Sequence, residues 1–270
     1  MKVICDTNIW YGIGNGSISL GECELPPLFA TYVNIDELAR TPNILYDLGN
    51  VRNAIKAAMT NAKYRTINDN PFIYMLKMEN PDFKPDLPHD TAILKLTTTF
   101  ANGGSIIDEN LEAFNKDWIE PRQKELQDIA DAYNQLFDNI NEGIGGGVRT
   151  KEYRKLDAIP FIKDFINDRI GDWTEHHLGE RKTLSDEFDW KQIELYLNTW
   201  ASWYVELSVS KMRFQPNDAY DLSNLVYVGP EDKYWTKEIR WQKIIKDIAG
   251  LGHYLVEYKD ENYFPKIAAK

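Results

Sequence analysis

Acidic residues in this chain recur where a predicted strand ends or a predicted helix begins. Asp6 directly follows the apolar run 1–5, which is typical of a buried parallel strand. A second short strand is predicted at Leu28–Val33. Asn34 then begins a helix, and Glu37 follows three residues later, which is the spacing of a capping box. The two acids therefore follow two consecutive strands of an expected α/β sheet.

Three further acids lie near the end of the chain. Asp218 and Asp221 are three residues apart, so both can face one side of a helix that opens at Pro216. Glu238 follows a short strand predicted at Tyr234–Trp235. Ligands bind at the carboxyl ends of the strands in open parallel sheets. Acids gathered there raise one another's pKa unless a cation compensates, and oxygen-only ligands suit Mg²⁺ or Mn²⁺.

These residues stand in the order of a known family. The Asp-Thr-Asn segment at positions 6–8 resembles the opening motif of the PIN-domain nucleases. That family continues with an acid early in its second helix, which Glu37 matches, and with an acid that opens a late helix, which Asp218 matches. Asp221 matches a frequent extra acid, and the Thr-Lys-Glu segment at 236–238 is similar to the family's Thr-x-Asp-like motif.

Two features depart from the family pattern. Glu238 stands where Asp is usual, a change that displaces the metal or weakens its binding. The chain spans 181 residues between Glu37 and Asp218, where the plain domain has only a few helices. The resemblance therefore implies a discontinuous PIN-like three-layer α/β core with a central, mainly parallel sheet at 1–48 and 208–270, and a large all-helical insertion at 49–207.

The resemblance implies hydrolysis of RNA phosphodiester bonds by a divalent-metal-dependent ribonuclease. Mg²⁺ or Mn²⁺ bound by the acids would lower the pKa of a water molecule and stabilise charge on the phosphate. The implied catalytic residues are Asp6, Glu37, Asp218 and Glu238, and the implied metal ligands are the same four and Asp221. The residues expected to hold the carboxylates or contact the RNA backbone are Thr7, Asn8, Thr236, Lys211, Arg213, Lys237 and Arg240.

Simpler roles exist for several of these residues. Asp6 and Glu37 also suit helix capping, and Asp221 also suits a structural position at a helix start. Gly12–Gly16 lacks the spacing of a dinucleotide fingerprint and is predicted to form a turn. The adjacent pair 176–177, both His, does not present one helix face to a metal ion.

The charge distribution separates the middle of the chain from its ends. The formal net charge is −11, which by itself argues against a nucleic-acid-binding protein. Residues 1–45 carry 2 basic and 5 acidic groups, residues 46–210 carry 19 and 28, and residues 211–270 carry 10 and 9. The negative charge is therefore concentrated in the predicted insertion, which we expect to have a solvated helical surface or a surface for a protein partner.

The remaining pattern predicts helices in the middle of the chain and strands near its ends. A loop around one helical turn is predicted at 70–88, and Pro121 is expected to restart a helix. A last strand is predicted at His253–Tyr258. The predicted helices span Leu45–Lys63, Leu111–Phe137, Tyr153–Ile170, Phe188–Val209, 216–226 and Ile239–Ala249.

Composition narrows the remaining function classes. Hydrophobic residues make up 43% and charged residues 27% of the chain, which is ordinary for a globular protein. The sequence contains no run of about 18 apolar residues, so no membrane span is predicted. The two cysteines, Cys5 and Cys23, and the lack of a signal-like N-terminus favour the reducing cytoplasm. Oligomeric state stays open.

Two other functions stay open. The first is a catalytically weak PIN-like module that binds protein or RNA through its helical insertion; Glu238 and the net charge motivate it. The second is a metal-dependent phosphatase for a small phosphorylated substrate. Metal affinity separates the first from the ribonuclease, and turnover of small phosphoesters separates the second.

Overall fold

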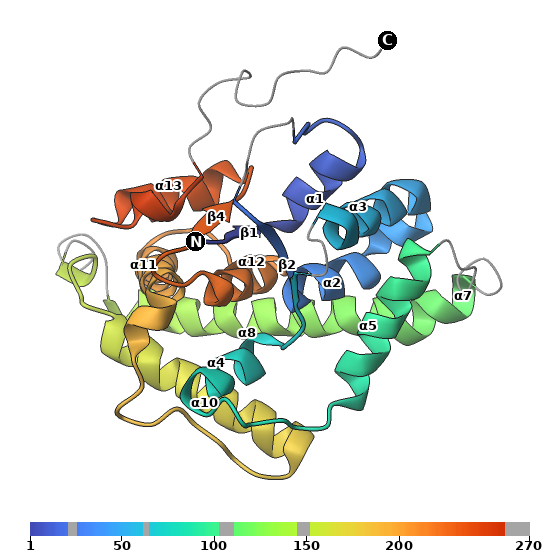
Figure 1. Ribbon diagram of the computed structural model, residues 1–270. Helices are drawn as coiled ribbons and strands as arrows, with labels where there is room; N and C mark the ends of the chain where they lie inside the picture. Colours follow the sequence, from blue (N-terminus) through green and yellow to red (C-terminus); the bar gives the residue numbers. More distant parts are fainter. Residues whose placement is uncertain (21–25, 62–64, 103–110, 145–151, 257–270) are drawn as a thin grey trace.

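The computed structural model describes residues 1–20, 26–61, 65–102, 111–144 and 152–256 (Figure 1). At the centre of this described part lies a four-stranded parallel sheet with the strand order β3-β2-β1-β4. Ile4 in the central strand is paired with Phe29 on one side and Tyr234 on the other. The predicted α/β class with a parallel sheet is confirmed. The strands are β1 (Val3–Cys5), β2 (Leu28–Thr31), β3 (Thr66–Ile67) and β4 (Lys233–Trp235).

The two edges of the sheet differ from the prediction. At the β4 edge, the predicted strand His253–Tyr258 is wrong where it is described, because a 3-10 turn covers Gly252–Tyr254 and only Leu255 forms a bridge to Tyr234. The residues from 257 onward lie outside the described residues. At the other edge, β3 comes from within the range 49–207, which we expected to be all helical. The division into core and insertion stays a prediction.

Alternation along β1 divides the apolar side chains between two cores. Val3 and Cys5 point to one face of the sheet, where Cys5 is fully buried. Ile4 points to the other face. Helices cover both faces, so the charged and polar residues at the strand ends are held between two packed layers. The helices on the side of Val3 include α1 (Thr7–Gly14), α2 (Tyr32–Ala39), α3 (Leu48–Asn61) and α5 (Pro88–Ala101); those on the side of Ile4 include α11 (Glu194–Val209), α12 (Asp218–Asn224) and α13 (Ile239–Asp247).

The helix α1 continues through the glycines that we expected to form a turn. It ends only at Gly14, and the left-handed residue is Gly16, with a φ of 77°. A Cβ on Gly14 would lie 2.5 Å from the backbone carbon of Asn53 in α3. The prediction of a turn was therefore wrong for Gly12–Gly14, where glycine lets two helix backbones touch, and confirmed for Asn15 and Gly16.

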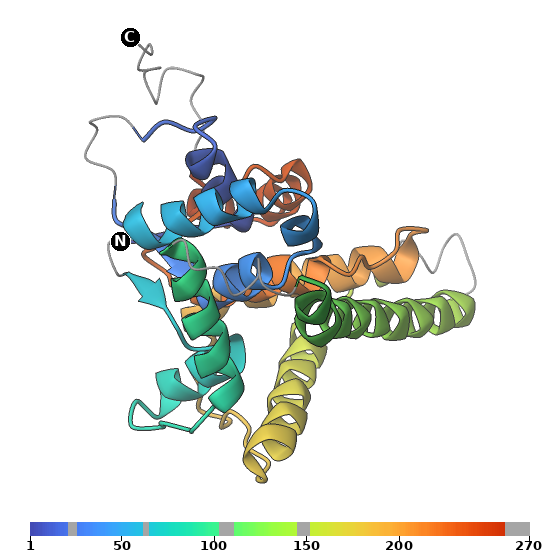
Figure 2. The same cartoon turned by 90° about the vertical axis from the view of Figure 1, so that its right-hand side faces the viewer.

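The middle of the chain forms long helices that pack below and beside the sheet. Figure 1 shows α8 crossing the molecule between the sheet and the pair α4 and α10, and Figure 2 shows α8 and α10 diverging at the outer side. Pro121 lies in the first turn of α8, as predicted. The segment 70–88 contains the nine-residue α4 rather than one turn, because Asn70 caps the N–H of Ile73. These helices are α4 (Pro71–Glu79), α7 (Leu111–Phe114), α8 (Glu120–Ile144) and α10 (Ile159–Leu178).

The remaining predicted helices are found with shifted ends. The helix predicted from 153 begins at Ile159, and the aromatic-rich helix predicted from 188 begins at Glu194 after a 3-10 turn. Cys23 lies outside the described residues. Within the described ranges, no helix combines the length and the apolar character needed to cross a bilayer.

Candidate active site

Asp6 is fixed at the carboxyl end of β1 by contacts from both ends of the chain. It caps α1, where its Oδ1 accepts the backbone N–H of Thr7 at 2.7 Å. Its Oδ2 accepts from the Asn8 amide and from the Thr236 hydroxyl, each at 2.6 Å. The Asp6 backbone N–H also donates to the carbonyl of Trp235 in β4. Since its exposed fraction is 4%, the carboxylate has one orientation relative to the sheet.

Glu37 reaches the same place from α2 (Tyr32–Ala39). The Thr7 hydroxyl donates to Glu37 Oε2 at 2.5 Å and accepts from the Asn34 amide at 3.1 Å. Thr7 therefore joins α1 to α2 through one hydroxyl group. This connection places Glu37 beside Asp6, although 31 positions separate them in the sequence.

The start of α2 differs from the prediction, and this gives Asn34 its role. The strand β2 ends at Thr31, which is the N-cap, and its side chain accepts the Asn34 N–H at 3.3 Å. The Asn34 side-chain Oδ1 accepts the Thr31 backbone N–H at 3.0 Å in return. The predicted pairing of Asn34 with Glu37 as a capping box was therefore wrong by one helical turn, and Glu37 is left to face the site.

The C-terminal half contributes three acids around one guanidinium group. Arg240 Nη2 lies 2.5 Å from Asp218, 3.4 Å from Asp221 and 3.6 Å from Glu238. The Asp218 side chain is fully buried, and Trp241 Nε1 donates to Asp221 at 2.7 Å. Two acids thus come from α12 and one from the residue before α13, as their sequence positions suggested.

Two tryptophans hold the Arg240 guanidinium in place. Its central carbon lies 4.7 Å from the ring centroid of Trp241 and 5.4 Å from that of Trp203. A guanidinium over an indole face is attracted by the ring quadrupole. Arg240 was predicted to contact the RNA backbone, whereas in the structure it is a counter-ion for the acids.

The surroundings of Asp6 and Glu37 disfavour their ionised forms. Burial raises the pKa of Asp6 to about 6, with a further increase from the charge of Glu238, against the hydrogen bonds that favour the ionised form. Burial likewise raises the pKa of Glu37 to about 7, and the charge of Asp6 adds to this effect. Perturbed acids grouped at a strand end are typical of functional sites.

The acids of α12 belong to the same electrostatic group. Burial raises the pKa of Asp218, and the pKa of Asp221 is raised well above its ordinary range by burial and by the charges of Asp6 and Glu37. The five carboxylates therefore influence one another electrostatically. Three of them contact Arg240, whereas Asp6 and Glu37 form no ion pair with an arginine among the described residues.

The oxygen donors of these acids suit a divalent metal ion, although their present placement does not form a metal site. In the described part of the chain, no group of three or more His, Cys, Asp or Glu side chains is placed so as to hold a metal ion. Asp218 Oδ1 and Glu238 Oε2 are buried there without a hydrogen-bond donor, although each forms an ion pair with Arg240. The donor set is oxygen-only, which suits Mg²⁺ or Mn²⁺.

The other predicted phosphate contacts are divided between two places. Lys237 is exposed next to the acids, and its backbone N–H donates to Asn8 Oδ1 at 3.1 Å. Arg213 instead pairs with Asp138 of α8 at 2.6 Å. Lys211 is exposed in the segment before α12. Of these three basic residues, the structure places Lys237 next to the acid group, the name used below for Asp6, Glu37, Asp218, Asp221 and Glu238 together.

Two amide side chains that the sequence did not single out also shape the site. Asn224 of α12 accepts from Thr31 at 2.7 Å and donates to the carbonyl of Cys5 at 3.3 Å, so it joins α12 to β1 and β2. Gln242 donates to the carbonyl of Thr236 at 2.8 Å. An amide within a helix carries no signal that distinguishes it from a surface residue, so sequence patterns did not identify either one.

Comparison with known proteins adds no relative. No protein-family profile, no curated protein and no solved structure matches this chain. The PIN-domain resemblance therefore stays a prediction from the ordered sequence motifs.

Proposed function

We propose that this protein is a divalent-metal-dependent, PIN-like ribonuclease that acts at the acid group. The observation that supports this most directly is the gathering of Asp6, Glu37 and the α12 acids at the carboxyl ends of β1 and β4. These acids come from segments up to 215 positions apart, so local helix capping does not explain their proximity.

In this proposal the chain supplies ligands and orientation. Asp6, Glu37 and Asp218 hold Mg²⁺ or Mn²⁺, and the bound ion supplies an acidified water and charge stabilisation at the phosphate. Thr7 and Thr236 fix the orientation of the carboxylates through the hydrogen bonds described above. The exposed Lys237 contacts the RNA backbone next to the acids.

Arg240 competes with a metal ion for the acids, and Glu238 is one of the acids that it contacts. Arg240 already neutralises part of the charge on Asp218, Asp221 and Glu238. A metal ion held by Asp218 would compete with this guanidinium, which would then remain available to Glu238 or to an RNA phosphate. Arg240 then has both the predicted phosphate contact and the counter-ion role.

The test is cleavage of a mixed panel of single-stranded RNAs in Mg²⁺ or Mn²⁺. Asp6→Asn and Asp218→Asn should each lower the rate by on the order of 100-fold, because each removes a charged ligand at the reacting phosphate. Asp128→Asn, an exposed acid on α8, is the matched control and should cleave like the wild type.

The outcomes separate the candidate functions. Metal-dependent cleavage lost in both variants and on chelation supports the ribonuclease. Turnover of small phosphoesters without RNA cleavage supports a metal-dependent phosphatase. If the wild type and both variants are equally inactive and calorimetry detects no metal binding, the enzymatic proposal is wrong.

The ion pairs of Arg240 favour one second candidate. A guanidinium that satisfies Asp218 and Asp221 without a metal ion is what a catalytically weak PIN-like module would have. Such a module would bind protein or RNA through the helices of the range 49–207. Unchanged stability on addition of millimolar Mn²⁺ would favour this candidate over the ribonuclease.

A further inference from the structure

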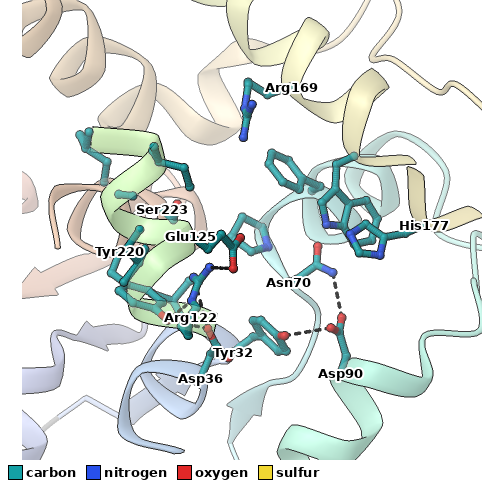
Figure 3. A pocket seen from close by; sticks show the side chains of 18 of the residues that line it. Tyr32, Asp36, Asn70, Asp90, Arg122, Glu125, Arg169, His177, Tyr220 and Ser223 are labelled. Atoms are coloured by element: carbon teal, nitrogen blue, oxygen red, sulfur yellow. Dashed lines mark hydrogen bonds and ion pairs between the residues drawn. The ribbon is translucent and has the colours of Figure 1, made fainter. Parts of the chain in front are cut away.

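A second site lies on a different face of the helices that carry the acids. Glu37 of α2 and Asp221 of α12 belong to the acid group, whereas their neighbours in sequence, Asp36 and Tyr220, border a cavity of about 350 Å³. Figure 3 shows this cavity, which is also lined by residues of α4, α8, α10 and the segment before α5. A volume of this size is at the lower end of the range found for small-molecule sites.

Aromatic rings form much of the cavity wall. The ring centroid of Trp173 of α10 lies 5.6 Å from that of Phe72 of α4 and 4.7 Å from that of His177. Phe165 lies 5.8 Å from Tyr133 of α8. The rings of Phe72, Tyr133, Phe165 and Trp173 are half-buried, so part of each borders the cavity. Rings from three helices facing one space favour a flat, aromatic occupant.

The charged side chain that points into this cavity is Arg169, which has no partner among the described residues. Figure 3 shows Arg169 pointing from α10 toward the middle of the cavity. Across the described residues, Arg169 forms no hydrogen bond and no ion pair, and it is exposed. Arg169 lines the cavity together with the rings of Tyr133 and Phe165. Burial raises the pKa of Tyr133 to about 12, and the positive charge of Arg169 opposes this increase.

The other arginines of the cavity are already compensated. Arg122 pairs with Glu125 at 2.6 Å and with Asp36 at 3.4 Å, and Arg40 also contacts Asp36. Their positive charge is therefore used within the protein.

The acidic side of the cavity is partly compensated. The carboxylate of Asp90 accepts from Tyr32 and from Asn70, each at 2.8 Å. Asp86 is exposed at the border of the cavity. Among the described lining residues, the charged side chains without a hydrogen-bond or ion-pair partner are Arg169, which points toward the middle of the cavity, and Asp86 at its border.

We propose that this cavity binds a planar aromatic molecule with one anionic group, its ring against Phe72, Phe165 and Trp173 and its phosphate or carboxylate on Arg169. A nucleoside monophosphate and an aromatic carboxylate share this chemistry. The proposal does not depend on the ribonuclease activity, because none of its residues belongs to the acid group.

Calorimetry on the full chain, with a chelator present so that no metal ion recruits phosphate to the acids, tests the proposal. The probes are adenosine monophosphate, phenyl phosphate and benzoate; adenosine lacks the anion, and inorganic phosphate lacks the ring. We expect saturable binding of at least one anionic aromatic probe, about tenfold tighter than either control. Phosphate probes and benzoate together identify which source of the anion the site prefers.

Four variants test whether the probes bind in this cavity. Arg169→Gln should lower the affinity for the anionic probe about tenfold and leave the affinity for adenosine unchanged. The control is Arg154→Gln, which removes an exposed guanidinium outside the cavity and should change neither affinity. Trp173→Leu should weaken the anionic probe and adenosine together. Asp6→Asn should bind like the wild type, which separates this site from the acid group.

Urea unfolding of each variant confirms that it is folded. Absence of saturable binding by every anionic aromatic probe at millimolar concentration would overturn the proposal. Equal affinity of the wild type and folded Arg169→Gln would overturn it as well, since binding would then occur elsewhere.

Discussion

Two adjacent residues of α2 show how one helix serves opposite electrostatic purposes. Asp36 is 2% exposed and lies among Arg40, Arg122 and the Tyr220 hydroxyl, which donates to it at 2.8 Å. Glu37 is half-buried, accepts from Thr7 and has no arginine partner among the described residues. The first acid is fully compensated and structural. The second is left with a raised pKa, and uncompensated charge of this kind is available to a ligand.

The largest expected effect comes from breaking the compensated side. Asp36→Asn leaves Arg40 and Arg122 partly buried without their shared carboxylate, so the free energy of unfolding should fall by about 3–5 kcal/mol. Urea unfolding at pH 7 measures this change. Glu37→Gln is the matched neighbour and should not destabilise the protein at that pH. Equal losses in the two variants would remove the distinction between the two faces.

The uncompensated side predicts a pH dependence. The pKa of Glu37 is raised to about 7 from 4.5, and that of Asp6 to about 6 from 3.8. The folded state therefore holds these protons more tightly than the unfolded state, so stability falls as the pH rises from about 4 to about 7. The contribution of Glu37 is about 2–3 kcal/mol.

Unfolding curves between pH 4 and pH 8 measure this slope. Glu37→Gln should flatten it, because the variant has no proton to lose at that position. Asp128→Asn, which removes an exposed acid far from the site in sequence, serves again as the control and should keep the wild-type slope. An identical slope in Glu37→Gln would show that the pKa of this carboxyl group is not raised by folding.

The same contrast explains how far the sequence could predict this structure. The start of α12 and the strands β1 and β4 followed from an apolar run or a helix-opening pattern that each carries locally. The strand β3 has two half-buried residues and no such run, and it exists because β2 is there to pair with it. Pairing across the chain leaves no local signal.

The candidate site divides in the same way. The positions of the acids at strand ends and helix starts came from local motifs, and the structure brings those residues together. The role of Arg240 as a counter-ion did not follow from a local motif, because a basic residue near acids in the sequence suits a phosphate contact equally well. Asn34 was assigned to the wrong end of its capping box, since the strand–helix boundary lies at Thr31.

A smaller effect is expected from removing the one guanidinium of the acid group. Arg240→Gln should lower the free energy of unfolding by about 2 kcal/mol at pH 8, less than a fully buried pair because Arg240 is about one-third exposed. At pH 5 the loss should be smaller, because the raised pKa values keep more of the acids protonated.

Metal binding provides the complementary measurement for this variant. Arg240→Gln should bind Mn²⁺ more tightly than the wild type, because a competing cation is gone. Calorimetry at pH 7.5 measures the change, with Arg154→Gln as the charge-matched control. A weaker affinity for Mn²⁺ would mean that Arg240 assembles the acids rather than competing for them.

The smallest expected effect concerns the orientation of Asp6. Asn8→Ala removes the 2.6 Å hydrogen bond to Asp6 and the oxygen that accepts the Lys237 N–H at 3.1 Å. The free energy of unfolding should fall by only about 1 kcal/mol, because Asn8 is half-buried and water replaces part of both bonds. Its loss also raises the pKa of Asp6 further, since that hydrogen bond favours the ionised form. The fall in stability with rising pH should therefore extend to higher pH in Asn8→Ala. An unchanged pH dependence would mean that Thr7 and Thr236 orient the carboxylate without Asn8.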